Sequence, residues 1–164
     1  MLTKYSGVLA ILALIYLSGV QGDVSSKTKN FIYVGDTLFY IEENVWKNWF
    51  QARLFCENLG YNLISLDSQE KYNVINRFLD DKGSNGSFWT SGNDFLTLGK
   101  HTWFPSGQPV DPALWHPAQP DNTNGEQHCD EFRYNFTYLM NDDSCHFQKN
   151  FICERSLASP PANP

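Results

Sequence analysis

The sequence has no apolar run long enough to span a membrane. Its longest apolar stretch, from Gly7 to Val20, covers 14 residues, whereas a transmembrane helix needs about 20. Lys4 precedes this stretch and small residues around Gly22 follow it, which is typical of an export signal. We therefore expect residues 1–22 to be a cleaved signal peptide, with an uncleaved membrane anchor as the alternative. The predicted mature protein is secreted and extracellular, without membrane insertion.

Positive charge is scarce in this chain. Its 164 residues include 12 Lys and Arg against 18 Asp and Glu, and the net charge is −6. No basic cluster is present in the sequence, and nucleic acids and anionic lipid surfaces are bound mainly through such clusters. We therefore expect no nucleic-acid partner.

Motifs of common catalytic sites are missing. The sequence contains neither a Gly-x-Ser-x-Gly elbow nor a His-Glu-x-x-His metalloprotease motif. Glu126, Asp130 and Glu131 with His128 are candidates for acid–base hydrolysis of a glycan. Metal-ligand or exposed-strand roles account for these residues more simply, and we expect that the protein is not an enzyme.

Cysteine is used sparingly. The four cysteines are Cys56, Cys129, Cys145 and Cys153. No Cys-x-x-Cys pair occurs and the four histidines are scattered, which argues against a zinc site. An even number of cysteines behind an export signal indicates two disulfides, for which three pairings exist. Sequons at Asn85 and Asn135 are candidate glycosylation sites.

The expected regular elements are short and of both types. Helices are predicted over residues 49–59, after an N-cap at Asn48, and over 67–80, where Asp67 and Glu70 form a capping-box pattern. Two short strands are expected within 31–41, joined by a tight turn at Gly35-Asp36. Further strands are expected at 63–66, 88–89, 129–132, 138–140 and 150–153. This is the pattern of a single α+β domain. We place it at residues 39–155, between an N-terminal segment at 23–38 and a flexible tail at 156–164.

The stretch from Thr90 to Glu126 is rich in Gly, Pro, Asn and Asp but also holds large aromatic residues. A loop of this length in a compact domain is usually functional or disordered, and its aromatic residues argue for order. Near its end, and shortly before Cys145, stand the oxygen-bearing side chains of Gln119, Asp121, Asn141 and Asp142. Amide and carboxylate oxygens are the ligands that calcium prefers. A cis bond before Pro120 would bring Gln119 and Asp121 to the same side. The alternative to a calcium site is that all four are ordinary turn residues.

In their order and spacing, these segments resemble the C-type lectin-like domain family. The resemblance spans roughly Phe39 to Glu154. It rests on Trp49-Phe50-x-Ala52-x-x-x-Cys56, Leu63-Ile64-Ser65-Leu66, Phe88-Trp89-x-Ser91-Gly92, Trp115-x-x-x-Gln119-Pro120-Asp121, Asn141-Asp142-x-x-Cys145 and Phe151-Ile152-Cys153-Glu154. The resemblance implies two helices, short antiparallel sheets and a long ordered calcium-binding loop. It also implies the disulfides Cys56–Cys153 and Cys129–Cys145.

The resemblance also implies a function. Family members that bind sugar hold one Ca2+ with residues matching Gln119, Asp121, Asn141 and Asp142 and with a glutamate shortly before the Cys129 position, and two sugar hydroxyls complete the shell. Gln-Pro-Asp is the galactose-type tripeptide of this family. We therefore expect a secreted, calcium-dependent lectin for glycans with terminal galactose or related sugars, and oligomers are expected to strengthen such binding. The alternative is a calcium-independent, protein-binding domain of the same fold.

Three positions depart from the family pattern. The fifth ligand position falls on Gln127, with Glu126 one residue earlier; we favour Glu126 as metal and carbohydrate ligand because a hard cation prefers an anionic oxygen. Met140 stands where Trp is usual. Asp94 matches one acid of an accessory calcium site of some members, but Leu98 stands where another is expected, so we predict one calcium ion.

Overall fold

The computed structural model describes residues 30–135 and 137–156. The predicted signal peptide lies outside these ranges, and so does the predicted tail except for Ser156, which is the last residue of strand β8 and pairs with Thr37. Its elements are β1 (Phe31–Val34), β2 (Thr37–Lys47), α2 (Trp49–Asn58), β3 (Asn62–Leu63), α3 (Gln69–Asp81), β4 (Ser87–Asn93), β5 (Thr102–Trp103), the 3-10 turns η1 (Pro112–Leu114) and η2 (Thr123–Gly125), β6 (Cys129–Tyr134), β7 (Tyr138–Asp143) and β8 (Lys149–Ser156). Both predicted helices are present. No helix in the described ranges is long and apolar enough to cross a membrane.

The two helices begin at side-chain caps. The predicted cap of α2 is confirmed, because Asn48 accepts a hydrogen bond from the backbone of Gln51 and the Gln51 side chain bonds back to Asn48. The predicted start of α3 is wrong by one residue, since the cap is Ser68, whose hydroxyl accepts from the backbone N–H of Lys71. Asp67 instead forms an ion pair with the Lys71 ammonium at 2.9 Å. Satisfying the first free N–H groups in this way typically stabilises a helix by about 1 kcal/mol.

The strands form one sheet in the order β1-β2-β8-β4-β6-β7, with β3 paired to β8 and β5 to β4. All pairings are antiparallel except that of β4 with β8, which is parallel. The predicted strand at 63–66 is shorter than expected, because only Asn62–Leu63 pairs as β3. Beyond it, Ile64 donates to Ile152 and accepts from Ser91, so this segment bridges two strands. The architecture confirms the predicted α+β class.

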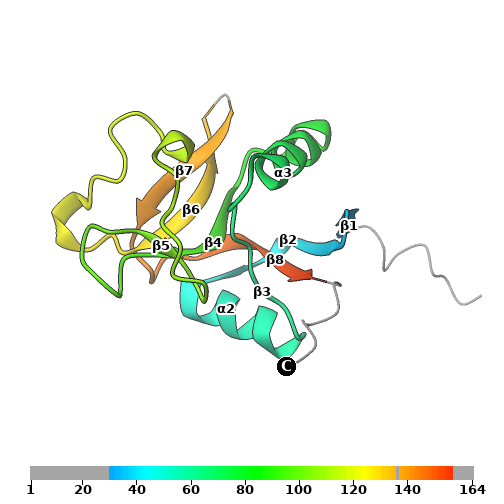
Figure 1. Cartoon of the computed structure of the whole chain (residues 1–164), viewed down its shortest axis with the longest axis horizontal. Helices are drawn as coiled ribbons and strands as arrows, with labels where there is room; N and C mark the ends of the chain where they lie inside the picture. Colours follow the sequence, from blue (N-terminus) through cyan, green and yellow to red (C-terminus); the bar gives the residue numbers. More distant parts are fainter. Residues whose placement is uncertain (1–29, 136, 157–164) are drawn as a thin grey trace, which may run out of the picture. The chain divides into compact units, whose positions relative to one another are not determined.

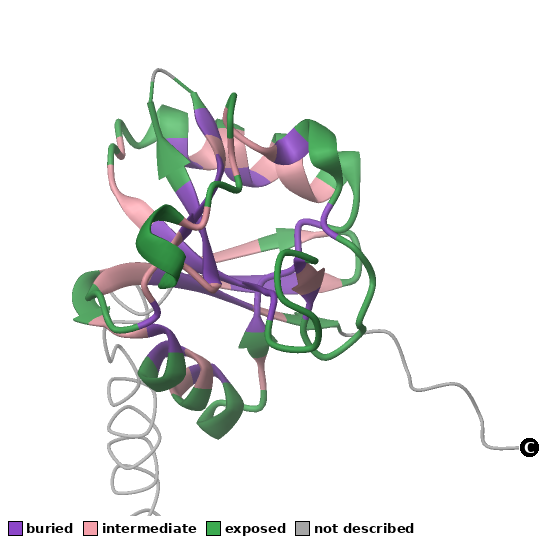
Figure 2. Ribbon diagram, turned by 90° about the vertical axis from the view of Figure 1, so that its left-hand side faces the viewer, coloured by how far each residue is buried: buried purple, intermediate pink, exposed green. Residues whose placement is uncertain are grey.

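Helices α2 and α3 lie on opposite sides of the sheet (Figures 1 and 2). The core cluster on the α3 side contains Ile75 and Leu79 together with Phe88 of β4. The cluster on the α2 side contains Trp49 and all four cysteines. Because both faces of the sheet are covered, β4 is buried from Phe88 to Asn93 without the alternation of a one-sided strand.

Two disulfides hold the ends of the domain and its long loop. They join Cys56 to Cys153 and Cys129 to Cys145, which is the pairing that the family resemblance implies. The first closes a separation of 97 residues and the second one of 16. In the chain-entropy account they stabilise by about 4–5 and about 3 kcal/mol. The inner disulfide ties β6 to the turn after β7, beside the predicted ligands.

Candidate functional site

The long loop between β4 and β6 is fastened to the outer edge of β7. Trp115 forms a parallel bridge with Met140, and the backbone N–H of His116 donates to the Met140 carbonyl at 2.9 Å. Met140 is fully buried, so at the position where the family usually has Trp, it fills a core site. The bridge leads the chain directly into the Gln119-Pro120-Asp121 turn.

This turn meets the end of β7 through the carboxylate of Asp142. The Gln119–Pro120 bond is cis, which is the condition under which the sequence analysis expected Gln119 and Asp121 to lie on the same side. Asp142, which is fully buried, accepts the backbone N–H of Asp121 at 3.1 Å and that of Asn122 at 2.8 Å. The Asp121 carboxylate accepts from the backbone N–H and the hydroxyl of Thr123 at 3.0 and 2.7 Å. The structure thus brings Gln119, Asp121 and Asp142 to one place.

The side chain of Asn141 is oriented by Glu131, for which the sequence analysis did not predict this role. Its Nδ2 donates to Glu131 Oε1 at 2.9 Å and to the Asp142 carbonyl at 2.6 Å. Glu131 faces Asn141 across β6 and β7, is fully buried, and forms an ion pair with Lys149 at 2.8 Å. Because both contacts use the amide nitrogen, the Asn141 oxygen keeps its capacity to bind a ligand.

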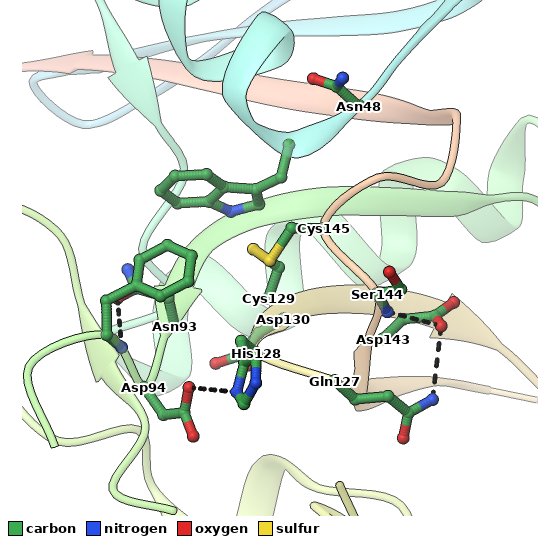
Figure 3. Close-up of a disulfide and its surroundings, with 12 residues drawn as sticks. Asn48, Asn93, Asp94, Gln127, His128, Cys129, Asp130, Asp143, Ser144 and Cys145 are labelled. Atoms are coloured by element: carbon green, nitrogen blue, oxygen red, sulfur yellow. Dashed lines mark hydrogen bonds and ion pairs between the residues drawn. A yellow bond between two sulfur atoms is a disulfide. The ribbon is translucent and has the colours of Figure 1, made fainter. Parts of the chain in front are cut away.

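The fifth predicted ligand, Glu126, is exposed, and its side chain forms no hydrogen bond or ion pair among the described residues. Its neighbour Gln127 lies inside the cluster instead. Gln127 accepts from the backbone N–H of Thr123 at 2.8 Å and donates to Asp143 at 3.4 Å, and Asp143 pairs with Lys149 at 2.6 Å. Figure 3 shows Gln127 directed toward Asp143 beside the Cys129–Cys145 disulfide.

Two His–Asp pairs near the Cys129–Cys145 disulfide form a second polar cluster. His128 lies 3.0 Å from Asp94, and His101 lies 2.6 Å from Asp130, the former pair being visible in Figure 3. Complete burial raises the pKa of Asp130 to about 6, although His101 opposes this shift. Burial lowers the pKa of His101, but its hydrogen bond to Asp130 and the nearby carboxylates outweigh burial and leave that pKa raised.

Gly92 shows why the segment beside this cluster needs a glycine. A Cβ atom on Gly92 would lie 2.2 Å from Oδ2 of Asp130 and 2.8 Å from its Cβ. The Asp130 side chain therefore occupies the space of a side chain at position 92.

Asp94, the one acid that matches the accessory calcium site of some family members, is held by His128 and by the backbone N–H of Gly99 at 2.8 Å. Leu98, which stands where another acid is expected, is 75% exposed.

The predicted ligand set carries little negative charge. Across the described ranges, no three or more His, Cys, Asp and Glu side chains are arranged so that they could together hold a metal ion. Without the exposed Glu126, the predicted set consists of two carboxylates, Asp121 and Asp142, and the amides of Gln119 and Asn141. The Thr123 hydroxyl, together with its backbone N–H, holds the pKa of Asp121 below its usual value. Asp121 is thus ionised near neutral pH.

Comparisons with known proteins agree with this architecture. Residues 45–155 match the family described as the lectin C-type domain. The chain is 33% identical to C-type lectin 37Da of Drosophila melanogaster over 132 residues, 76% of this chain and 70% of that protein. It is 31% identical to salivary C-type lectin 1 of Aedes albopictus over 120 residues, 68% of this chain and 78% of that protein.

Solved structures share the fold. The mouse scavenger receptor C-type lectin carbohydrate-recognition domain is 28% identical, with a TM-score of 0.68 that covers 81% of this chain and 98% of that chain. A calcium-independent type II antifreeze protein, 24% identical, has a TM-score of 0.66 over 78% of this chain and 92% of that chain. The fold alone therefore does not determine whether a domain binds calcium, which depends on the residues of the site.

Proposed function

The chain belongs to the C-type lectin domain family, and from this premise we propose that it is a secreted, calcium-dependent glycan-binding protein without catalytic activity. The observation that carries the proposal is the junction between the 119–121 turn and the end of β7. There the buried Asp142 carboxylate accepts two backbone N–H groups of the turn, which holds the turn that bears Gln119 and Asp121 against the strand end that bears Asn141 and Asp142.

The chemistry of these side chains fits calcium. Calcium takes six to eight oxygen ligands from carboxylates, amides and backbone carbonyls. We propose that Gln119, Asp121, Asn141 and Asp142 hold one ion, which supplies a positive centre that sugar hydroxyls can join as ligands. For the fifth position, the contacts of Gln127 favour it over Glu126. Because site charge tunes affinity, a set with two carboxylates should bind calcium weakly, with Kd of about 0.1–1 mM.

The sugar class follows from the order of amide and acid around the proline. Gln119 precedes Pro120 and Asp121 follows it, and an acid accepts hydrogen bonds from a hydroxyl whereas an amide can also donate. This order supports galactose or a related sugar as the ligand. Asn122 and Thr123, which follow the turn, offer no aromatic ring to stack on a sugar face.

The second candidate is a calcium-independent domain of the same fold that binds a protein. The calcium-independent antifreeze protein, with its shared fold, makes this alternative concrete. Thermal unfolding discriminates between the two. An ion that binds only the folded state stabilises it by about 1.4 kcal/mol when its free concentration is ten times Kd; no calcium-dependent rise in Tm would favour the alternative.

The proposal is tested by binding of the full secreted chain to galactose-terminated and mannose-terminated glycans, with millimolar calcium and with a chelator. We expect calcium-dependent binding with preference for galactose, lost in Asp121→Asn. Asp111→Asn is the matched control, because Asp111 also lies in the long loop and accepts the backbone N–H two residues on, at 2.9 Å. Binding that persists in chelator, or that Asp121→Asn leaves intact, contradicts the proposal. Release of product from labelled galactosides would contradict its non-catalytic part.

The fifth ligand is assigned by two further variants. If Gln127 serves, Gln127→Ala should weaken calcium binding and Glu126→Gln should not. If the loop shifts to use Glu126, the effects are reversed.

A further inference from the structure

We propose that the glycan site continues into a cationic subsite centred on Arg133, which favours ligands that carry a sulfate or carboxylate beside the bound sugar. This inference rests on the proposed function and adds the charge of the substrate to it. Nothing in the Gln119-Pro120-Asp121 turn itself supplies such a preference, because its one charged side chain is acidic.

The register of β6 and β7 places Arg133 next to the proposed ligands. Glu131 pairs with Asn141 and Arg133 pairs with Leu139. Side chains alternate along a strand, so Arg133 shares the face of Glu131 and Asn141. Diagonal neighbours across an antiparallel pair lie about 7–8 Å apart, within reach of a long side chain. The guanidinium of Arg133 can therefore reach a ligand seated at Asn141.

A hollow lies between this face and the loop segment along β7. It has a volume of about 350 Å3 and is lined by His116, Pro117, Gln119, Arg133, Asn135 and Asn141. That volume lies at the lower end of the range of small-ligand sites. Two of the lining residues, Gln119 and Asn141, belong to the proposed calcium set. The hollow thus opens at the sugar itself and has room for one substituent or a neighbouring sugar unit.

The positive charge of Arg133 is not paired with any other group in the described part of the chain. Its side chain takes part in none of the hydrogen bonds, ion pairs or cation–π contacts found there, whereas Arg53, Lys71 and Lys149 are each paired with a carboxylate. No acidic residue lines the hollow, although the chain carries a net charge of −6. A second lining residue, His116, has a buried Nε2 without a partner.

These features select an anion over a neutral group. A guanidinium presents a planar fork of N–H donors that matches two oxygens of a sulfate or a carboxylate. Because Arg133 is exposed, the gain in affinity should be moderate and should fall as salt rises. We expect a preference of about 3-fold to 10-fold for the anionic ligand.

The test compares three probes that differ at one position: galactose, galactose 6-sulfate and galacturonic acid. Binding to the full secreted chain is measured in calcium at low and high salt. All proteins carry Asn135→Gln, which keeps a glycan out of the hollow without the negative charge that a peptide amidase leaves behind when it converts glycosylated asparagine to aspartate. The 6-sulfate and the uronic acid separate a sulfate-specific subsite from a carboxylate-specific one.

We expect at least one anionic probe to bind more tightly than galactose, and Arg133→Gln to abolish that difference while galactose affinity stays within about twofold. Arg133→Lys, which keeps the charge but loses the fork, should give an intermediate preference. Arg77→Gln is the matched control, because Arg77 is also exposed on α3 and unpaired among the described residues; it should leave the preference unchanged.

Equal affinity for all three probes in the parent protein overturns the inference while leaving the proposed function intact. A preference that survives Arg133→Gln, or an equal loss of all three probes in that variant, also overturns it. If galactose does not bind in calcium, the proposed function fails. In that case, anion binding that Arg133→Gln abolishes still supports the subsite, and absence of binding to every probe overturns both.

Discussion

Glu131→Gln should weaken both the folded state and the proposed calcium site, because one buried carboxylate serves Lys149 and Asn141 together. The Lys149 ammonium lies 2.8 Å from Oε2 of Glu131, and Asn141 Nδ2 lies 2.9 Å from Oε1. Breaking a buried ion pair by removing one partner costs about 3–5 kcal/mol. Since Lys149 keeps Asp143 at 2.6 Å, we expect the lower end of this range, about 3 kcal/mol in the free energy of unfolding.

The measurement is urea unfolding followed by tryptophan fluorescence, in chelator and with the disulfides intact. Chelator separates the loss of the ion pair from any loss of bound calcium. A second readout is the side-chain amide resonance of Asn141, which should shift when its acceptor at Glu131 loses charge. A calcium titration should then show an affinity reduced by about 10-fold, the usual effect of changing a residue that orients a ligand.

Glu57→Gln is the control for the chemical change itself. Glu57 pairs with Arg53 at 2.7 Å, but both side chains are more than one-third exposed. Such pairs contribute less than about 0.5 kcal/mol. Equal losses of stability in Glu57→Gln and Glu131→Gln, or an unchanged Asn141 resonance, would refute the orienting role of Glu131.

Two further predictions concern the cluster behind the disulfide. His101 and Asp130 both have raised pKa values. The folded domain therefore binds more protons than the unfolded chain from about pH 4 to above pH 6.5. The contribution of this pair to the free energy of unfolding should fall as pH rises through that window. Asp130→Asn should flatten the dependence of the urea midpoint on pH, and an unaltered slope would exclude the pair as its source. Gly92→Ala should destabilise the domain by about 1–3 kcal/mol, since the new Cβ would lie 2.2 Å from Asp130 Oδ2; a stable Gly92→Ala protein with an unchanged urea midpoint would contradict this packing.

Much of the fold follows from local sequence signals, and the errors have tertiary causes. Asn48 was identified as a cap because no competing cap residue adjoins it. Asp67 and Ser68 are adjacent and both are good caps, so the sequence does not choose between them. The choice is made by Lys71, which reaches Asp67 at 2.9 Å and Glu154 of β8 at 2.7 Å. The ion pair with Glu154 holds Lys71 in place, and the ion pair with Lys71 occupies Asp67, which leaves Ser68 to cap the helix.

The candidate site was predictable where side-chain chemistry alone decides. Gln119, Asp121, Asn141 and Asp142 stand out as oxygen donors on two short segments. Arg133 does not stand out, and Glu131 stands out only as a candidate acid–base or metal-ligand residue. Their roles beside Asn141 depend on which residues of β7 they face, and strand register cannot be read from residue type.

The choice between Glu126 and Gln127 depends on the backbone of the loop before β6. Asn122 and Asn124 adopt left-handed conformations there, with φ of 42° and 60°, and a tight turn of this kind decides which side chain points inward. Glu126 and Gln127 are similar in size, and the charge that favoured Glu126 in the sequence does not determine which side chain points inward.

The sheet order has a practical consequence for presenting this domain. The described chain enters at β1, and Thr37 pairs with Ser156 near its exit, while the ligand set lies at β7, the last strand of the order at the other end of the sheet (Figure 1). A tether attached beyond either end would therefore leave the proposed ligand set facing solution. If the proposed glycan binding holds, copies of the domain coupled through their ends to a bead or a polymer should form an array of accessible sites, and weak single contacts would add up to firm attachment on a glycan-coated surface.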